Sequence, residues 1–195
     1  MYKNFIKPVC DWLIALIAFP FFCVLWIIVA IAIKIEDGGP VFYMAERIGK
    51  NSKKLMMYKF RSMKVNAENI LNADGSTYNA KDDSRVTKVG KFLRVTSLDE
   101  TAQILNMLKG EMSLIGPRAS GWDALPTYKE DEIAKMNVRP GLTGYSQAYF
   151  RNGISVREKR LNDAWYANNI SFWLDVKIFF KTIITVLKHE NIYTN

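Results

Sequence analysis

The stretch that decides the fold runs from Leu13 to Ile33 and reads LIALIAFPFFCVLWIIVAIAI. It carries no charged residue, and at about 1.5 Å of rise per residue it can cross a bilayer core of roughly 30 Å as a helix. Pro20 interrupts the run near its middle, and proline removes a backbone donor and clashes with the preceding helical turn. We therefore expect a helix-break-helix whose limbs, 13–19 and 21–33, form a re-entrant hairpin within residues 1–36.

Positive charge flanks this run on both sides. Lys3 and Lys7 precede it and Lys34 follows it, and because translocated ends are poor in lysine and arginine, both ends are predicted to be cytoplasmic. A straight spanning anchor stays an equal alternative, since spanning helices tolerate proline. A cleaved signal peptide fits less well, because the run is too long and lacks a small-x-small cleavage site. Asp11 is expected to lie at the interface or to bond to a neighbour.

Length and composition bound the remainder of the chain. The 195 residues leave one domain of ordinary size over 37–195, and the net charge of +8 points to an anionic partner such as a phospholipid surface, a nucleotide or a nucleic acid. Both cysteines, Cys10 and Cys23, lie in or beside the apolar run, where they act as small hydrophobes. With His189 as the lone histidine, zinc chemistry and a histidine-based triad are excluded.

Periodicity and turn residues predict a helix-rich α+β fold. Helices are expected at 64–71, 98–109, 123–136, 155–168 and 172–188, and short strands at 41–43 and 55–60. The polar stretch 72–83 reads as a mobile surface loop.

The last predicted helix is amphipathic in a particular way. Its lysines form one narrow stripe, and its aromatic and aliphatic side chains occupy the opposite side. A core helix with a solvated lysine face is the common explanation of such a pattern, but a neighbouring membrane segment favours a helix lying in the membrane interface. The stripe consists of Lys177, Lys181 and Lys188, and the apolar side of Phe172, Phe179, Ile183, Val186 and Leu187.

An acidic pair, Asp99 and Glu100, is the candidate centre of the chemistry. Ser97 with Glu100 forms a capping box before an apolar-periodic run, and taken alone this structural explanation is the commoner one. The same position suits a nucleophilic carboxylate, because free amides and the helix dipole would keep Asp99 ionised and favour a bound phosphate.

Basic residues in and beside rigid loops strengthen the catalytic hypothesis. Arginine in a fixed turn presents a fork that matches phosphate oxygens. If these cations converge on the acidic pair, they make a diphosphate pocket in which a divalent cation completes the neutralisation. The residues are Lys59, Arg61, Arg94, Arg118 and Arg139.

The ordered motifs of the chain resemble one family, the monotopic phosphoglycosyl transferases, also called bacterial sugar transferases. The resemblance covers nearly the whole chain and is closest to small members that resemble the undecaprenyl-phosphate phosphosugar transferases and consist of the catalytic domain alone. It rests on the segments 58–63, 94–100, 108–118 and 138–144 and on Asp163, Trp165, Tyr166, Asn169, Ser171, Leu174 and Asp175.

This resemblance implies a re-entrant helix broken at Pro20, a catalytic domain on the cytoplasmic face of the bacterial inner membrane, and interfacial amphipathic helices. It implies an enzyme that moves a sugar 1-phosphate from a UDP-sugar to polyprenyl (undecaprenyl) phosphate and releases UMP, as the first membrane step of glycoconjugate synthesis. Asp99 would form a covalent phosphosugar intermediate and hold Mg²⁺, and Glu100 would complete the dyad. Phosphate oxygens would be bound by Lys59, Arg94, Arg118 and Arg151.

Two positions depart from the family pattern: Phe19 replaces a serine before the break proline, and Ala119 replaces the proline that usually follows Arg118. A second class of function, a membrane-anchored basic binding protein without catalysis, stays in view, with Tyr58, Phe60, Tyr145, Tyr149 and Phe150 as base-stacking residues. The chain has no nucleic-acid-binding signature and no basic arm, so nucleic acid is not the expected partner. The sugar and the oligomeric state, including a homo-oligomer, stay open.

Overall fold

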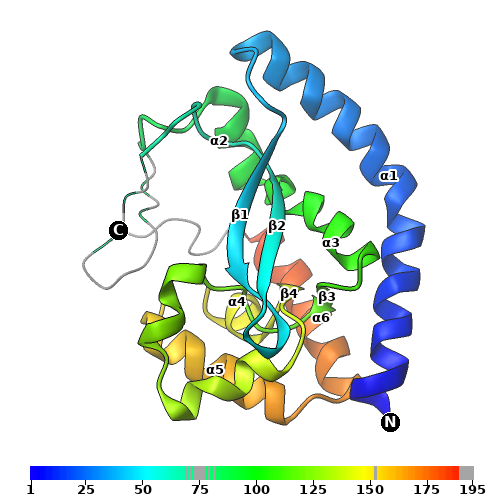
Figure 1. The fold of residues 1–195 in the computed structure, drawn as a ribbon. Helices are drawn as coiled ribbons and strands as arrows, with labels where there is room; N and C mark the ends of the chain where they lie inside the picture. Colours follow the sequence, from blue (N-terminus) through cyan, green and yellow to red (C-terminus); the bar gives the residue numbers. More distant parts are fainter. Residues whose placement is uncertain are drawn as a thin grey trace.

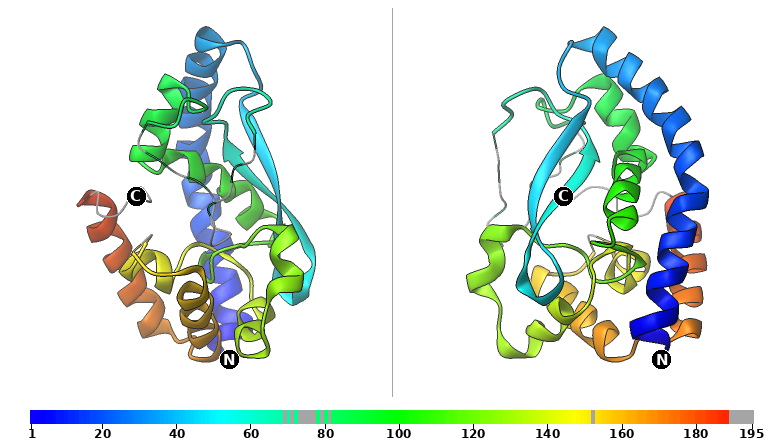
Figure 2. Two further views of the ribbon diagram at one scale, coloured as in Figure 1. Left: turned by 90° about the vertical axis from the view of Figure 1, so that its left-hand side faces the viewer. Right: turned by 45° about the vertical axis from the view of Figure 1, so that its right-hand side comes forward.

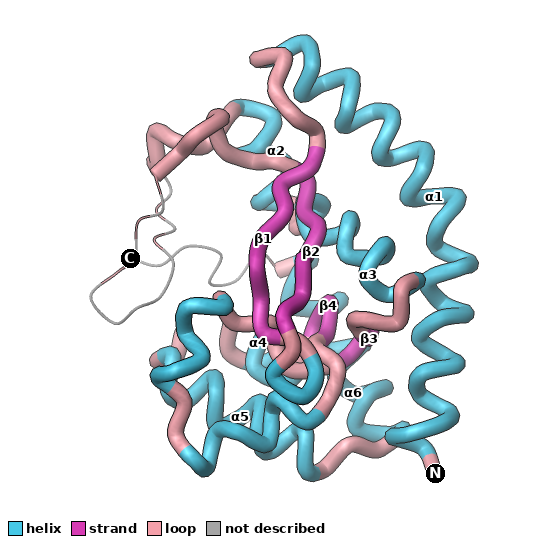
Figure 3. The backbone as a smooth tube through the Cα atoms, in the orientation of Figure 1, coloured by secondary structure: helices cyan, strands magenta, loops and turns pink. Residues whose placement is uncertain are grey.

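A computed structural model describes residues 1–188 except 69, 71, 73–77, 79, 81 and 152. A long N-terminal helix runs along one side of a body made of short helices, a two-stranded hairpin and a small parallel pair of strands (Figure 1). Helix and loop predominate over strand throughout (Figure 3). The predicted helix-rich α+β class is therefore confirmed.

The helix α1 (Lys7–Glu36) follows a π-helical turn at Tyr2–Ile6 and continues through Pro20 without a break. It is long and apolar enough to cross a membrane, and most of its apolar side chains are exposed. The expected break into two limbs is not confirmed: Pro20 lies on the exposed side, and α1 bends around the body as one continuous helix (Figures 1 and 2).

Both ends of α1 are bonded to the same body. Near its start, Lys7 pairs with Asp175 of α6 (Phe172–Leu187) at 2.7 Å. At its end, the Glu36 carboxylate accepts from the backbone amide of Lys88, at 2.6 Å, and from that of Val89, at the start of α2 (Lys88–Val95). The helix is thus held along the body and not suspended from it by one end.

The strands β1 (Phe42–Ile48) and β2 (Lys54–Phe60) form an antiparallel hairpin whose register pairs Phe42 with Phe60. Its inner face packs on α1, where Phe22, Val29 and Ile33 bury against Phe60. The aromatic and β-branched residues of both strands explain the pairing, since such side chains fill a half-buried pleated surface. The hairpin carries Lys59 on its second strand, close to the end that leads to α2.

The chain next enters a helical segment with two parts. Leu98–Gln103 is a 3₁₀ helix, and α3 (Ile104–Leu108) continues from it. The parallel pair β3 (Ser113–Ile115) and β4 (Gly141–Thr143) follows, with 3₁₀ helices at Trp122–Thr127 and Glu130–Asn137 between its strands. The remaining helices are α4 (Tyr145–Tyr149), α5 (Val156–Asn168) and α6.

Several sequence-based boundaries need correction. The helices expected at 155–168 and 172–188 are confirmed as α5 and α6. The helix expected at 64–71 is absent from the described residues of that segment, and 123–136 is two 3₁₀ pieces with Pro126 inside the first, which removes a backbone donor. The loop expected at 72–83 lies largely outside the described residues.

Candidate active site

The acidic pair lies at the start of the 3₁₀ helix, directly after Ser97. Ser97 has a left-handed backbone conformation, with φ of 58°, and its side chain caps no backbone amide. The predicted capping box is therefore wrong. Because the Glu100 carboxylate does not turn back to the helix start, the structural explanation for this acidic pair loses its main support.

Glu100 forms ion pairs with two cations from distant parts of the chain. Its Oε1 accepts from Lys59 Nζ at 2.7 Å and from an Arg118 guanidinium nitrogen at 3.2 Å. Burial opposes ionisation, but these two cations outweigh it and lower the pKa of Glu100 to about 2. Glu100 is therefore an ionised carboxylate that fixes the positions of Lys59 and Arg118.

Asp99 has a different environment, although it is the adjacent residue. Its side chain is buried, Lys59 Nζ lies 3.9 Å from its Oδ2, and no hydrogen bond to its carboxylate occurs within the described part of the chain. Burial raises the pKa of Asp99, and the Glu100 charge adds to this, while Lys59, Arg94 and Arg118 oppose it. The expected effect of the helix start, which would keep Asp99 ionised, is thus opposed by burial, which raises the pKa of Asp99. A desolvated carboxylate without hydrogen bonds is a stronger nucleophile than a hydrated one.

A buried asparagine fixes the strand against the helical segment. Asn106 Oδ1 accepts from the backbone amide of Tyr58 at 3.0 Å, and its Nδ2 donates to the carbonyl of Met56 at 2.8 Å. Asn106 thus binds the edge of β2 as a neighbouring strand would, and this holds Lys59 opposite Glu100. Sequence reasoning missed it; the available signal was a polar residue in the apolar run 104–108.

The loop that carries Arg118 is held in place by a hydrogen bond to Asp163. The backbone amide of Arg118 donates to Asp163 Oδ2 at 3.1 Å, and Asp163 also accepts from Ser146 Oγ and pairs with Lys135. A side chain on Gly116 would collide with the neighbouring backbone at 139–141, so the two Gly/Pro loops pack directly on one another. The Arg118 side chain contacts Glu100 even though Ala119 stands where the family pattern has a proline.

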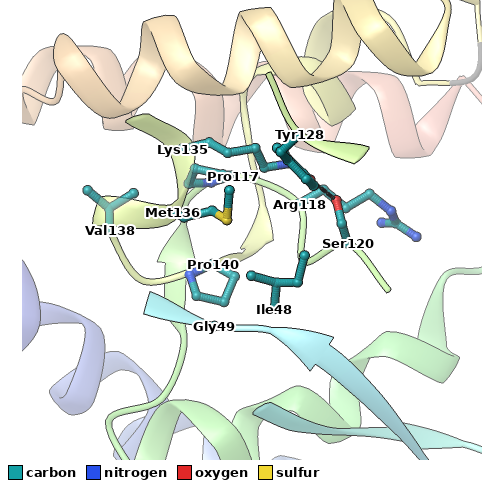
Figure 4. Close-up of a pocket in the computed structure, with 10 residues that line it drawn as sticks. All are labelled: Ile48, Gly49, Pro117, Arg118, Ser120, Tyr128, Lys135, Met136, Val138 and Pro140. Carbon is teal, nitrogen blue, oxygen red and sulfur yellow. Dashed lines mark hydrogen bonds between the residues drawn. The ribbon is translucent and has the colours of Figure 1, made fainter. Parts of the chain in front are cut away.

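A small cavity lies behind this loop (Figure 4). Its volume is about 10 Å³, which is room for about one water molecule and excludes a sugar ring. Ser120, Tyr128 and Lys135 supply its polar atoms, and Tyr128 donates to Ser120 Oγ at 2.5 Å. We interpret it as the packed support of the Arg118 loop.

The other predicted phosphate ligands are distributed unevenly. Arg94 lies close enough to lower the pKa of Asp99, and its Nε donates to Ser62 Oγ at 3.0 Å. Arg61 is turned away from the pair: it is buried, is salt-bridged to Asp37 and donates to the carbonyls of Pro40 and Met63. Its role is to join β2 to the end of α1.

Three further cations complete the distribution, two of them predicted from the sequence. Arg139 lines a groove on the α1 side of the molecule, and Arg151 has a left-handed backbone, with φ of 47°. Sequence reasoning missed Arg47. It is half-buried, interacts electrostatically with Arg118 and Glu100, and has a buried Nε without a hydrogen-bond partner among the described residues. The site therefore gathers Lys59, Arg94, Arg118 and Arg47.

Metal ligands are sparse in this arrangement. No group of three His, Cys, Asp or Glu side chains able to hold a metal occurs among the described residues. Glu100 is already occupied by Lys59 and Arg118, which leaves the Asp99 carboxylate with free oxygens. One protein carboxylate plus substrate phosphates is an ordinary way to hold Mg²⁺, so the residues fit an ion that arrives with a diphosphate.

The aromatic residues considered for base stacking do not form one surface. Phe60 is buried in the core, and Tyr145 contacts Tyr149, Phe150 and Trp165. Tyr58 lies apart on β2, where Lys109 covers its ring. This weakens the interpretation as a nucleic-acid-binding module.

Comparison with known proteins finds bacterial relatives that match most of this chain. The chain is 38% identical over 202 residues to the undecaprenyl-phosphate galactose phosphotransferase of Salmonella typhimurium, covering 98% of this chain and 41% of that protein. It is 40% identical over 189 residues to the UDP-N-acetylgalactosamine-undecaprenyl-phosphate N-acetylgalactosaminephosphotransferase of Aeromonas hydrophila, covering 94% and 44%. It is 37% identical over 194 residues to the exopolysaccharide production protein ExoY of Rhizobium meliloti, covering 94% and 86%.

The chain thus spans less than half the length of the first two relatives and most of the third. The family model described as bacterial sugar transferase matches residues 2–189, which is nearly the whole chain. The chain belongs to the bacterial sugar transferase family.

Proposed function

We propose that this protein transfers a sugar 1-phosphate from a UDP-sugar to polyprenyl (undecaprenyl) phosphate and releases UMP. The observation that carries the proposal is the contrast within the acidic pair: Glu100 is held by Lys59 and Arg118, whereas Asp99 is buried beside the same cations without a hydrogen bond from any described residue. Names of the relatives from Salmonella typhimurium and Aeromonas hydrophila agree with this class of reaction.

In the first step an Asp99 oxygen attacks the phosphorus next to the sugar. The bond between that phosphorus and the bridging oxygen breaks, UMP leaves with the electron pair, and an aspartyl-phosphosugar forms. In the second step an oxygen of polyprenyl phosphate attacks the same phosphorus, and the Asp99 carboxylate leaves. The nucleophile is regenerated, so atoms and charges balance over the cycle.

The surrounding residues bind and orient in this scheme. Lys59, Arg94 and Arg118 hold phosphate oxygens, and Arg47 adds positive potential behind them. Glu100 is a positioning residue: it stays ionised and holds Lys59 and Arg118 rather than donating a proton. Mg²⁺, held by Asp99 and diphosphate oxygens, would supply charge neutralisation.

We also infer a monotopic placement in the bacterial inner membrane, with the body on the cytoplasmic side. Both ends of α1 are bonded to one body, through Lys7 and through Glu36, which disfavours a helix that carries its start across the bilayer. The exposed apolar side of α6, including Trp173, Phe180 and Leu187, supports an interfacial helix. In this re-entrant placement, a bend in the continuous helix α1 replaces the break that was expected at Pro20.

The covalent intermediate gives the decisive test. Enzyme in detergent or nanodiscs, given a UDP-sugar and Mg²⁺ without acceptor, should release at most about one UMP per site and gain a phosphosugar mass on the peptide with Asp99. A panel of UDP-sugars identifies the donor first, through UMP release with acceptor present. An unmodified enzyme under conditions of proven turnover would contradict the two-step scheme, and absence of UMP release with every donor would contradict the reaction itself.

Topology is tested separately by labelling. Single cysteines at positions 3 and 50, in a background lacking Cys10 and Cys23, should react only with reagents that reach the cytoplasm. Reaction of the position 3 cysteine from outside the cell would show that α1 spans the bilayer.

A further inference from the structure

A groove lies between the first turns of α1 and the far end of α3, away from the acidic pair. Its volume is about 380 Å³, and its walls combine apolar side chains of α1 with two cationic side chains. It is lined by Pro8, Val9, Trp12, Met107, Leu108, Lys109, Gly110 and Arg139. No carboxylate is present among these described lining residues.

Arg139 is the unusual member of the groove. Its side chain is half-buried, yet its guanidinium has no hydrogen bond or ion pair within the described part of the chain. An anion in the groove would therefore meet a guanidinium that has no other counter-ion among the described residues. Lys109, by contrast, already donates to the Tyr58 hydroxyl at 2.8 Å.

The space beside the guanidinium is kept open by Gly110. This glycine has φ of +73°, and a Cβ built there would lie 3.7 Å from an Arg139 nitrogen. Larger side chains would fill the place where an anion meets the guanidinium. The fork of an arginine suits two oxygens of one phosphate.

The apolar wall indicates that this phosphate belongs to a lipid. Val9 and Trp12 are exposed on the one helix that is apolar enough for a membrane, and tryptophan favours the depth of the lipid headgroups. A phosphate on Arg139 places acyl chains along these side chains. Free phosphate would use the cation and leave the apolar wall without a partner.

We propose that this groove binds an anionic phospholipid of the bilayer, with its phosphate on Arg139 and its chains against α1. This lipid is not the reacting acceptor. Lys109 follows Asp99 by ten residues of helical segment, on the order of 15 Å, so a phosphate at Arg139 lies far from the nucleophile. The bound lipid instead sets the depth and orientation of α1, and the proposal does not depend on the proposed reaction.

A matched pair at Gly110 gives the sharpest test. Asp and Asn both tolerate a left-handed backbone better than most residues, so Gly110→Asp and Gly110→Asn carry similar strain. Only the aspartate supplies Arg139 with an internal carboxylate that competes with lipid phosphate. Arg139→Gln removes the cation, and Lys53→Gln, at an exposed lysine of the hairpin turn, controls for the loss of one positive charge.

The full chain would be reconstituted in nanodiscs of equal phosphatidylglycerol and phosphatidylcholine, and retained lipids would be counted by native mass spectrometry. We expect wild type, Gly110→Asn and Lys53→Gln to retain phosphatidylglycerol preferentially. Gly110→Asp and Arg139→Gln should lose this preference about tenfold or more, as loss of a charge-assisted contact predicts. If Arg139→Gln fails to fold, the Gly110 pair alone decides.

Three results would overturn the proposal. Equal retention by Gly110→Asp and Gly110→Asn would show that Arg139 does not hold the headgroup. One-for-one displacement of phosphatidylglycerol by polyprenyl phosphate, abolished in Gly110→Asp, would make the groove the acceptor site. Displacement by millimolar inorganic phosphate would make it a simple anion site.

Discussion

Two pairs of carboxylates in this protein differ in how completely they are hydrogen-bonded. At the contact between α1 and α6, Asp175 accepts from Lys7, Tyr2 and Tyr166 at 2.6 to 2.7 Å. Asp11 accepts from Ser113 Oγ at 2.6 Å and from the Leu114 amide, which confirms the expectation that it bonds to a neighbour. At the other pair, Glu100 accepts hydrogen bonds from Lys59 and Arg118, while Asp99 accepts none from the described residues.

This difference in hydrogen bonding distinguishes carboxylates that stabilise the fold from a carboxylate that is a candidate for the chemistry. Buried charges that only hold a fold are paired and hydrogen-bonded, because an unsatisfied one costs several kcal/mol. Asp99 departs from that rule, whereas the adjacent Glu100 obeys it. Such a departure beside several cations is expected of a functional residue, and the substitutions below test whether the two regions respond as this contrast requires.

The largest expected effect is on turnover. Asp99→Asn keeps the shape of the side chain and removes the proposed nucleophile, so UMP release should fall at least about 10³-fold. Its melting temperature should stay within a few degrees of wild type, because Asp99 has no hydrogen bond to a described residue that could be lost. UMP assays and thermal melts on one preparation measure both quantities. Near-normal turnover would remove Asp99 as the nucleophile.

Asp175→Asn should show the reverse pattern. It leaves the buried Lys7 with only the longer contact to Asp11, at 3.9 Å, and breaking a buried pair costs about 3 kcal/mol or more of unfolding free energy. The fraction that stays folded should retain turnover within a few-fold, because Asp175 lies outside the cationic site. Denaturant titration in detergent micelles measures the loss, with Lys177→Gln as a single-charge control on the same helix. Unchanged stability would mean that α1 is held to the body by its apolar contacts alone.

How far the sequence predicted each region follows from the same physics. The apolar run, the hairpin strands and helices α5 and α6 were predictable, because periodicity reports burial directly. The capping box at Ser97 was not, since only the left-handed backbone there prevents it. Long-range partners such as Asn106 for β2 and Asp163 for the Arg118 loop depend on tertiary contacts that no local pattern encodes.

The sequence also predicted the positions of some cations correctly and of others incorrectly. Lys59, Arg94 and Arg118 were singled out from rigid loops and strand ends, and the structure brings all three to the acidic pair. Arg61 belongs to the same motif as Lys59, but it lies two residues further along the chain, beyond the end of β2. There it binds Asp37, a partner that sequence spacing does not reveal. A cluster of arginines in a sequence therefore predicts a phosphate site without saying which arginines are in it.

Removing Glu100 should have an intermediate effect. Glu100→Gln releases Lys59 and Arg118 from their shared carboxylate, and turnover should fall about 10- to 100-fold, as loss of hydrogen bonds to charged groups predicts. Glu46→Gln is the matched control, because Glu46 pairs with Lys54 at 2.9 Å on the exposed side of the same hairpin. That control should be nearly silent. A Glu100→Gln enzyme as active as the control would mean that Lys59 and Arg118 keep their positions without Glu100.

The smallest effect is a shift in pH dependence, and it reports on Asp99 most directly. Burial raises the pKa of Asp99 above its ordinary value, whereas the pKa of Glu100 is held at about 2. As pH falls, Asp99 therefore protonates first, and the acid limb of the single-turnover UMP burst follows the pKa of Asp99. Glu100→Gln removes a negative neighbour that raises this pKa, so the limb should move to lower pH. Lys59→Gln removes a cation that lowers the pKa of Asp99, so the limb should move to higher pH.

Burst amplitudes and rates measured across the acid range in wild type and both variants give the two shifts. Shifts of opposite sign are required if Asp99 is the ionising group, because a limb set by UDP-sugar ionisation or by unfolding would not move in opposite directions. Parallel shifts, or none, would assign the acid limb to another group and leave the raised pKa of Asp99 without a role in the reaction.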